Sequence, residues 1–374
     1  MFSCLGKRAV QDFRPEEILV EVGSEKSRIF TNLRRALPEL PVTFVDQLHP
    51  YAEDPSVSND PFGKGKRRLF LQRHRGDFLK KCPGSDGQVC CNYFVINFAS
   101  NCPMECSYCY LQEYLADNPT LKVFSNVGDL ISEADELLSR HRRFFFRIGT
   151  GEITDSLALD PYIGFSSEVI PFFAEQPNVL LELKTKSHRV ENLLGLNPKG
   201  RVVVSWSMNP QKVIDRDEHL TASLEERLAA ARRCQEAGYK LGFHFDPIVE
   251  YPGWEKDYQT MVEEIFAKVE RRRIAWLSMG VLRNTPGLKR IMRKRFPSTQ
   301  LLSGEQVLGP DGKMRYFQPL RVEMYRKMLR WIRAASPTVF VYLCMESKEV
   351  WEQVFGFAPS CEKELGNRLA NLEV

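Results

Sequence analysis

The feature that most constrains the fold is a regular alternation of short apolar runs and longer amphipathic segments between residues 93 and 280. The apolar runs are rich in β-branched and aromatic residues, as expected of buried strands, and the segments between them have helical spacing. The predicted strands are residues 93–99, 144–149, 179–184, 201–207, 240–246 and 274–280. Six strand-helix repeats predict an α/β fold with a parallel sheet, curled into a partial (β/α)6 barrel of the TIM type.

The chain of 374 residues extends beyond this repeat at both ends. Residues 1–90 combine two strand patterns with one helical pattern, which predicts an N-terminal α/β extension. Residues 284–374 are less regular and contain a long helical pattern, which predicts a C-terminal cap over the barrel. We therefore predict three parts, with the barrel itself at 91–283.

The composition indicates a folded chain outside the membrane, since 43% of the residues are hydrophobic and no run approaches the ~20 apolar residues of a membrane span. The first residues lack the apolar core of a secretory signal, so we expect a cytoplasmic protein without a membrane partner. Cytosolic thiols are kept reduced, so the ten cysteines are expected to be thiols or metal ligands rather than a disulfide framework.

Two basic runs concentrate a net charge of only +4. Residues 64–81 contain eight Lys or Arg against one Asp, and residues 283–295 are similarly basic. Such runs are usually solvated faces, and binding to phosphate groups is the functional alternative.

Three cysteines follow the first predicted barrel strand with the spacing Cys-x3-Cys-x2-Cys, at Cys102, Cys106 and Cys109. The loops after barrel strands are where such folds place their chemistry. Thiolates select zinc, copper or iron–sulfur clusters, and three ligands rather than four leave a position open for a reactant. The pattern indicates a reactive metal centre. A structural zinc site with a distant fourth ligand, or three unrelated thiols, are the alternatives.

The second predicted strand ends in a glycine-rich turn with an acidic residue, formed by Gly149, Thr150, Gly151 and Glu152. Glycines let a backbone approach a ligand closely, and a carboxylate pairs with an ammonium group. An ordinary turn at a strand end is the alternative reading.

The cysteine spacing, with Tyr108 before the last cysteine, resembles the signature of the radical S-adenosylmethionine superfamily. The turn at 149–152 is similar to the Gly-Gly-Glu element of that superfamily. The resemblance implies that the three cysteines hold a [4Fe–4S] cluster and that Gly149, Gly151 and Glu152 receive the amino group of S-adenosylmethionine. It also implies reductive cleavage to a 5′-deoxyadenosyl radical, with an electron donor such as a flavodoxin or ferredoxin.

Residues 106–112, CSYCYLQ, place Tyr108 and Tyr110 on either side of Cys109 and resemble the spore photoproduct lyase family. The resemblance runs from about Cys82 to the 320s, and it implies DNA containing a thymine-type photolesion as the substrate. It implies further contacts with the cofactor: at its carboxylate, its sugar and its adenosyl group, by Lys186, Ser207 and Asp246 respectively. A surface lysine, a strand-end hydroxyl and a helix-capping group are the plain alternatives for these three.

Arg315 and Tyr316 resemble the Arg-Tyr pair with which the lyases engage their lesion. With the two basic runs, this pair predicts a nucleic-acid contact in the C-terminal part of the chain.

One position departs from the family, because the lyases carry a hydrogen-donating cysteine in the second-strand loop where this chain has Glu152. A carboxylate cannot donate a hydrogen atom. Either another residue serves, with Cys344, Tyr108 and Tyr110 as catalytic candidates, or the reaction differs. The alternatives are therefore a radical enzyme acting on a peptide or metabolite, and an iron–sulfur protein that only binds or relays electrons.

Cys82, Cys90 and Cys91 form a second group of thiols before the first barrel strand. They could support an auxiliary metal site, although adjacent cysteines rarely chelate one ion comfortably. A structural role is the alternative.

Overall fold

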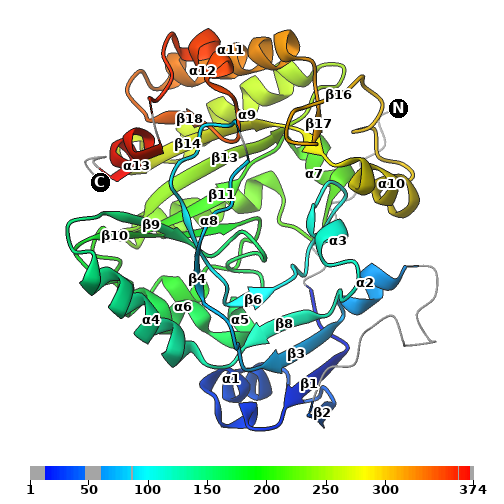
Figure 1. Ribbon diagram of the computed structural model, residues 1–374, viewed down its shortest axis with the longest axis vertical. Helices are drawn as coiled ribbons and strands as arrows, with labels where there is room; N and C mark the ends of the chain where they lie inside the picture. The colour runs from blue at the N-terminus through cyan, green and yellow to red at the C-terminus, as the bar shows by residue number, and fades with distance from the viewer. Residues whose placement is uncertain (1–12, 47–59, 86, 361, 371–374) are drawn as a thin grey trace.

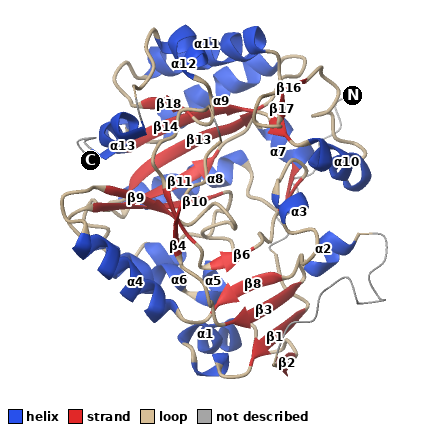
Figure 2. Ribbon diagram, viewed as in Figure 1, coloured by secondary structure: helices blue, strands red, loops and turns tan. Residues whose placement is uncertain are grey.

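A computed structural model describes residues 13–46, 60–85, 87–360 and 362–370. Within these ranges the larger sheet has eight strands in the order β18-β14-β13-β11-β10-β9-β5-β4 and curls into a partial barrel (Figures 1 and 2). Its strands are parallel apart from β4, which runs antiparallel to β5. The strands are β4 (Leu79–Lys81), β5 (Phe94–Ile96), β9 (Phe146–Gly149), β10 (Val179–Thr185), β11 (Val202–Ser207), β13 (Lys240–Ile248), β14 (Ile274–Val281) and β18 (Val341–Leu343). The predicted α/β partial barrel is confirmed.

Amphipathic helices cover the outer face of this sheet (Figure 2). The sequence sets their ends in recognisable ways: α8 begins after Ser223, whose hydroxyl accepts from the Glu226 N–H while the Glu226 carboxylate accepts from the Ser223 N–H. The long helices are α4 (Val127–Arg140), α6 (Phe165–Ala174), α8 (Leu224–Glu236), α9 (Trp254–Lys268) and α11 (Gln318–Ala335). Among the described helices, none is both long and apolar enough to cross a bilayer.

A second sheet, in the lower part of the view in Figure 1, joins the N-terminal region to the barrel. Its strand order is β2-β1-β3-β8-β6. The bounds are β1 (Glu17–Glu21), β2 (Val42–Val45), β3 (Arg68–Gln72), β6 (Ala99–Ser100) and β8 (Leu121–Phe124). This sheet therefore includes strands from both sides of residue 90, where we predict a domain boundary, and the division into three domains stays a prediction.

The run at 93–99, predicted as one strand, is shared between the two sheets. Its first half forms β5 in the barrel, and its last residue begins β6, which pairs with β8 in the N-terminal sheet. Between them the Asn97 N–H donates to the Phe78 carbonyl oxygen at 2.8 Å. Periodicity indicates an extended apolar run but not its pairing partner, which is why the change of sheet is invisible in the sequence.

The last ninety residues also contribute to the barrel, because β18 pairs with β14. The rest of this region forms a small antiparallel sheet and helices beside the barrel mouth (Figure 1). These elements are α10 (Pro286–Arg295), β15 (Arg283–Asn284), β16 (Val307–Leu308), β17 (Met314–Arg315), α12 (Lys348–Phe355) and α13 (Glu362–Ala370).

A polar layer crosses the barrel interior. Arg147 Nη2 donates to Glu182 Oε2 and to the Tyr342 hydroxyl, both at 2.9 Å. The other carboxylate oxygen of Glu182 lies 2.7 Å from His244 Nε2, and His244 Nδ1 lies 2.6 Å from the Ser278 hydroxyl. Buried polar groups are costly unless paired, so this chain of contacts is what allows charged residues inside the barrel.

Candidate active site

The three predicted cluster ligands lie on the loop between β6 and α3 (Leu111–Tyr114). Cys106 is buried, while Cys102 and Cys109 are half-buried. Cys106 belongs to β7 (Glu105–Cys106), which pairs antiparallel with β12 (Glu218–His219). The Cys109 N–H donates to the Cys106 carbonyl oxygen at 3.1 Å, so the backbone turns back on itself between the last two thiols.

The thiols lie close enough together to influence one another's ionisation. Burial raises the pKa of Cys102 to about 12 and also raises the pKa of Cys106 and of Cys109, and the other thiols of the loop contribute to these shifts. In the part of the chain that the structure describes, no three Cys, His, Asp or Glu side chains converge as ligands of a single ion do. Cysteines around an iron–sulfur cluster each bind a different iron, so three neighbouring thiols spread over one loop fit that donor set.

Two cations hold this loop from the outside. Lys66 is 4% exposed, and its ammonium lies 3.0 Å from Glu105 Oε1 and donates to the Met104 carbonyl oxygen. Arg295, at the end of α10, lies 2.9 Å from Glu105 Oε2 and also pairs with Asp60 at 2.8 Å. Both cations belong to the basic runs at 64–81 and 283–295, and here they pair with acidic side chains of the protein itself.

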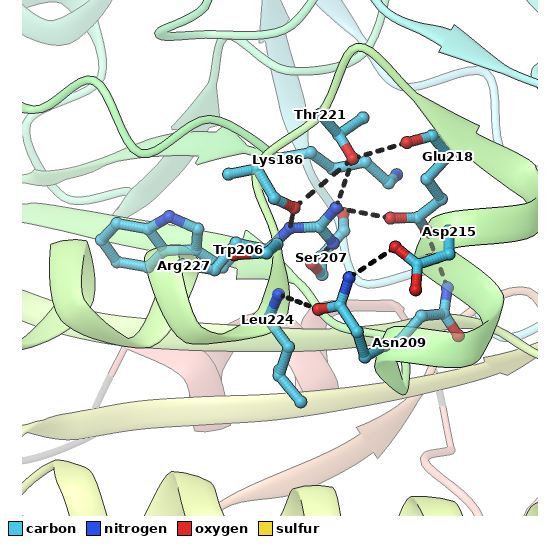
Figure 3. A network of polar contacts seen from close by, with 12 residues as sticks. Lys186, Trp206, Ser207, Asn209, Asp215, Glu218, Thr221, Leu224 and Arg227 are labelled. Atoms are coloured by element: carbon cyan, nitrogen blue, oxygen red, sulfur yellow. Dashed lines mark hydrogen bonds and ion pairs between the residues drawn. The ribbon is translucent and has the colours of Figure 1, made fainter. Parts of the chain in front are cut away.

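A buried polar network lies behind the loop (Figure 3). Arg227, which is 0% exposed, donates to Glu218 Oε2 at 2.6 Å and to the Thr221 hydroxyl at 2.7 Å. Glu218 Oε1 accepts from Asn209 Nδ2 at 2.8 Å and from the Tyr108 hydroxyl. Although burial alone would raise the pKa of Glu218, Arg227 and Lys186 lower it to about 2. The carboxylate is therefore a fixed negative charge at the back of the site.

Tyr108 and Lys186 meet in front of this network. The Lys186 ammonium lies 5.6 Å from the centre of the Tyr108 ring, within the range of a cation–π contact. Because its hydroxyl donates to Glu218, Tyr108 is tied into the protein, and burial raises its pKa well above the ordinary value. The network keeps the aromatic ring next to the cysteine loop.

The glycine turn after β9 is tightly packed against the protein. A side chain at Gly149 would place its Cβ 1.4 Å from the Tyr93 hydroxyl, and one at Gly151 would lie 2.8 Å from the Lys184 carbonyl oxygen. Both glycines are thus required by neighbouring protein groups. The next residue, Glu152, accepts a hydrogen bond from the Tyr110 hydroxyl on its backbone oxygen at 2.8 Å. This contact joins the turn to the cysteine loop.

Asp155 connects the same turn to the next strand end. Its Oδ1 accepts from the Thr185 hydroxyl at 2.7 Å, and its Oδ2 accepts from the Lys186 N–H at 2.8 Å. The turn after β9 and the residue after β10 are therefore held in register. No spacing pattern in the sequence singles out Asp155, Glu218 or Arg227, and the sequence reasoning missed all three.

Ser207 and Asp246 lie at the same end of the sheet, as expected for neighbouring parallel strands. Ser207 ends β11, and its carbonyl oxygen accepts from Arg227 Nη1 at 2.8 Å. Asp246, near the end of β13, lies 3.0 Å from Arg283 Nη2. Burial opposes ionisation of Asp246, but Arg283 prevails and lowers its pKa.

The remaining predicted residues lie further round the barrel. Cys344 follows β18, and its pKa is raised to about 12, by burial first and by the charge of Asp246. Arg315 is 4% exposed and pairs with Asp311 at 2.6 Å, while the hydroxyl of Tyr316, which is 3% exposed, accepts from the Glu250 N–H at 3.1 Å. A nucleic acid would meet these two side chains only after the hairpin that carries them opened, and their role stays a prediction.

Comparison with known proteins places this arrangement in a family. A family model described as spore photoproduct lyase matches residues 81–319. Curated relatives include spore photoproduct lyases from Geobacillus sp. (strain Y412MC61), 30% identical over 210 residues, and Bacillus subtilis (strain 168), 29% identical over 215 residues. These alignments cover 56% and 57% of this chain and 62% and 63% of the relatives, less than two thirds of their length.

Solved structures of spore photoproduct lyase share the fold. A double mutant with bound AdoMet and dinucleoside spore photoproduct has a TM-score of 0.78 and 24% identity, covering 89% of this chain and 99% of the other. A second structure, complexed with the dinucleoside spore photoproduct, has a TM-score of 0.77 with the same identity and coverage. The barrel, the cysteine loop and the matched range together show that the chain belongs to the spore photoproduct lyase family of radical S-adenosylmethionine enzymes.

Proposed function

We propose that this protein is a radical S-adenosylmethionine lyase that acts on a thymine-type photolesion in DNA. The observation that carries the proposal is the loop of Cys102, Cys106 and Cys109, held at the barrel mouth against the Glu218 network and the turn containing Glu152. Membership of the family supports it, as do related structures whose descriptions name AdoMet and a dinucleoside photoproduct.

The residues present suit the two cofactors. The three thiols would hold a [4Fe–4S] cluster, and a flavodoxin or ferredoxin would supply its electron. Glu152 and Lys186 offer a carboxylate and an ammonium group, which complement the ammonium and carboxylate of the methionine part of S-adenosylmethionine. Bound together, the cofactors supply a 5′-deoxyadenosyl radical that can remove a hydrogen atom from the substrate.

The side chains around the mouth act by fixing position and charge. The negative charge of Glu218 offsets the positive charges of Lys186 and Arg227, so the Lys186 ammonium stays beside the cysteine loop. Asp155 holds the backbone of Lys186, and Tyr110 holds that of Glu152. Such bonds orient binding groups before a ligand arrives, which lowers the cost of binding.

The test is anaerobic reconstitution of the cluster followed by addition of reductant, S-adenosylmethionine and DNA that contains a thymine photolesion. We expect 5′-deoxyadenosine and repaired thymine, and neither product from a Cys106→Ala protein. A Glu152→Ala protein should bind S-adenosylmethionine more weakly, while Glu136→Ala, an exposed change on α4, should not. The proposal fails if the intact protein forms no 5′-deoxyadenosine under any of these conditions.

A second candidate is a radical enzyme with a peptide or metabolite substrate. The internal pairing of Arg315 and Tyr316 favours it, together with the carboxylate of Glu152 in place of the lyase thiol. Cleavage of S-adenosylmethionine that is indifferent to every photolesion offered would support this candidate over the first.

A further inference from the structure

The proposed reaction ends on a carbon radical that must receive a hydrogen atom, and this inference rests on that proposed function. Thiols are suitable donors because an S–H bond is weaker than most C–H bonds. The turn after β9 ends in a carboxylate, Glu152, so a thiol has to reach this position from another element. The structure brings one there from the edge strand of the barrel sheet.

Cys82 is the residue that follows β4, and it is joined to the β9 turn by a short series of contacts. Its N–H donates to the Tyr93 carbonyl oxygen at 2.8 Å, in continuation of the antiparallel pairing of β4 with β5. The hydroxyl of Tyr93 fills the space in front of Gly149, three residues before Glu152. The thiol and the carboxylate therefore lie on neighbouring strands at the same rim.

The side chains themselves influence one another across this rim. Burial raises the pKa of Cys82, and the charges of Glu152 and Cys90 raise it further, while Lys184 lowers it. The pKa of Tyr110, whose hydroxyl donates to the Glu152 carbonyl oxygen, is likewise raised by burial first and then by Glu152, with Cys82 a further cause. Cys82 is half-buried, so its sulfur is accessible from the mouth.

The loop that carries Cys82 closes the barrel. The Val89 N–H donates to the Glu346 carbonyl oxygen at 2.9 Å, which joins the segment after β4 to the segment after β18 across the open edge of the sheet. Cys344 lies on that second segment, where the charges of Asp246 and Arg283 act on it. Among the described thiols outside the cysteine loop, Cys82 is the one on which Glu152 acts together with Tyr110.

We propose that Cys82 donates the hydrogen atom that completes the reaction. The S–H bond of Cys82 breaks homolytically and a C–H bond forms on the product, which leaves a sulfur-centred radical on Cys82. One electron from the low-potential donor that the proposed reaction already needs, and one proton from water, then restore the thiol. Cys90 lies in the same loop, with its sulfur 4.0 Å from the position of a Cβ on Gly84, but the contacts with Tyr110 and Glu152 belong to Cys82.

The first test compares Cys82→Ala with Cys90→Ala, a change in the same loop, in reactions run in heavy water. The Cys82→Ala protein should form 5′-deoxyadenosine at the parent rate but lose repaired product by about tenfold or more, whereas Cys90→Ala should retain both. The parent's product should carry one solvent-derived deuterium, because a thiol exchanges its hydrogen with water. Unchanged repair by Cys82→Ala, or product without solvent deuterium, would overturn the proposal while the proposed function stands.

The second test needs no cofactor. In a Cys90→Ala background, a Glu152→Cys protein treated with a mild oxidant should form a disulfide between Cys82 and the introduced thiol, detected by peptide mass spectrometry. A Glu136→Cys protein, changed at an exposed position on α4, should not. Absence of the first disulfide counts against the donor role. If the parent cleaves S-adenosylmethionine and repairs no lesion, the donor role and the proposed substrate are overturned together.

Discussion

The Tyr108 hydroxyl donates a hydrogen bond to the Glu218 carboxylate, and through this contact the cysteine loop is fastened to a charge pair with no exposure to solvent. Glu218 is also the partner of Arg227, so a single carboxylate serves both the loop and a fully buried guanidinium. Loss of that carboxylate would affect the fold as well as the site.

Replacing Glu218 with glutamine should lower the free energy of unfolding by about 3 to 5 kcal/mol, because Arg227 would be left as a buried charge without its counter-ion. Urea denaturation of the purified protein measures this. The matched control is Glu236→Gln, which breaks an exposed pair with Arg232 and should cost less than about 1 kcal/mol. Similar losses from the two changes would contradict the buried network.

The polar layer inside the barrel should make the protein sensitive to acid. Burial lowers the pKa of His244 below its ordinary 6.5, so the unfolded chain takes up a proton that the folded chain resists, and stability falls as the pH drops below 6.5. Burial opposes ionisation of Glu182, but Arg147 and His244 hold its pKa well below 4.5, so a second loss follows below that pH. Urea midpoints between pH 7.5 and 5.5 should shift less in His244→Gln, whereas His141→Gln, at an exposed position, should follow the parent.

Gly149→Ala should destabilise the protein by about 1 to 3 kcal/mol, because the new Cβ overlaps the Tyr93 hydroxyl. Combining it with Tyr93→Phe should recover part of the loss. Gly128→Ala in α4, where a Cβ meets nothing within 4 Å, should be neutral or stabilising. Thermal unfolding of the four proteins checks this, and a Gly149→Ala protein as stable as the parent would exclude the predicted overlap.

Arg295→Gln should reduce the iron retained after anaerobic reconstitution, because it removes the guanidinium that pairs with Asp60 and Glu105 beside the cysteine loop. Iron and sulfide analysis, with the visible absorbance of the cluster, measures the effect. Arg293→Gln, an exposed change on the same helix, should bind as much iron as the parent. Equal iron content in both variants would mean that the brace does not support the loop.

If DNA is the substrate, the exposed cations of α10 should contribute to its binding. Neutralising Arg290, Arg293 and Lys294 should weaken binding at low salt and reduce the salt dependence by about one per lost phosphate contact. Binding titrations at several salt concentrations check this. Arg272→Gln, at the exposed start of β14 and thus at the opposite end of the barrel, should leave the salt dependence unchanged.

The parallel strands were predictable because each is a short apolar run between helical patterns, and the cysteine loop because its spacing is specific. The partners of charged residues were not. Arg227 occurs in a helical segment rich in Glu and Arg, where a charged side chain reads as solvated, yet it is fully buried. Lys66 and Arg295 likewise contribute to basic runs in the sequence, whereas in three dimensions both meet Glu105.

The candidate site shows the same division. Residues at strand ends, such as Lys186 and Asp246, could be placed from the strand pattern because parallel strands end at one rim. Asp155 could not, because its role depends on two hydrogen bonds to the next strand, and neither leaves a trace in spacing. Cys82 was visible as a thiol, but its position beside Glu152 follows from the pairing of β4 with β5, which periodicity does not report.

The contact between Arg295 and Glu105 joins residues 190 positions apart in the chain. On the ribosome the cysteine loop emerges long before α10 has been made, and during that interval Glu105 has Lys66 available but not the second cation. The thiols are therefore least enclosed while the chain is still growing, and the enclosure is completed only when its last third arrives.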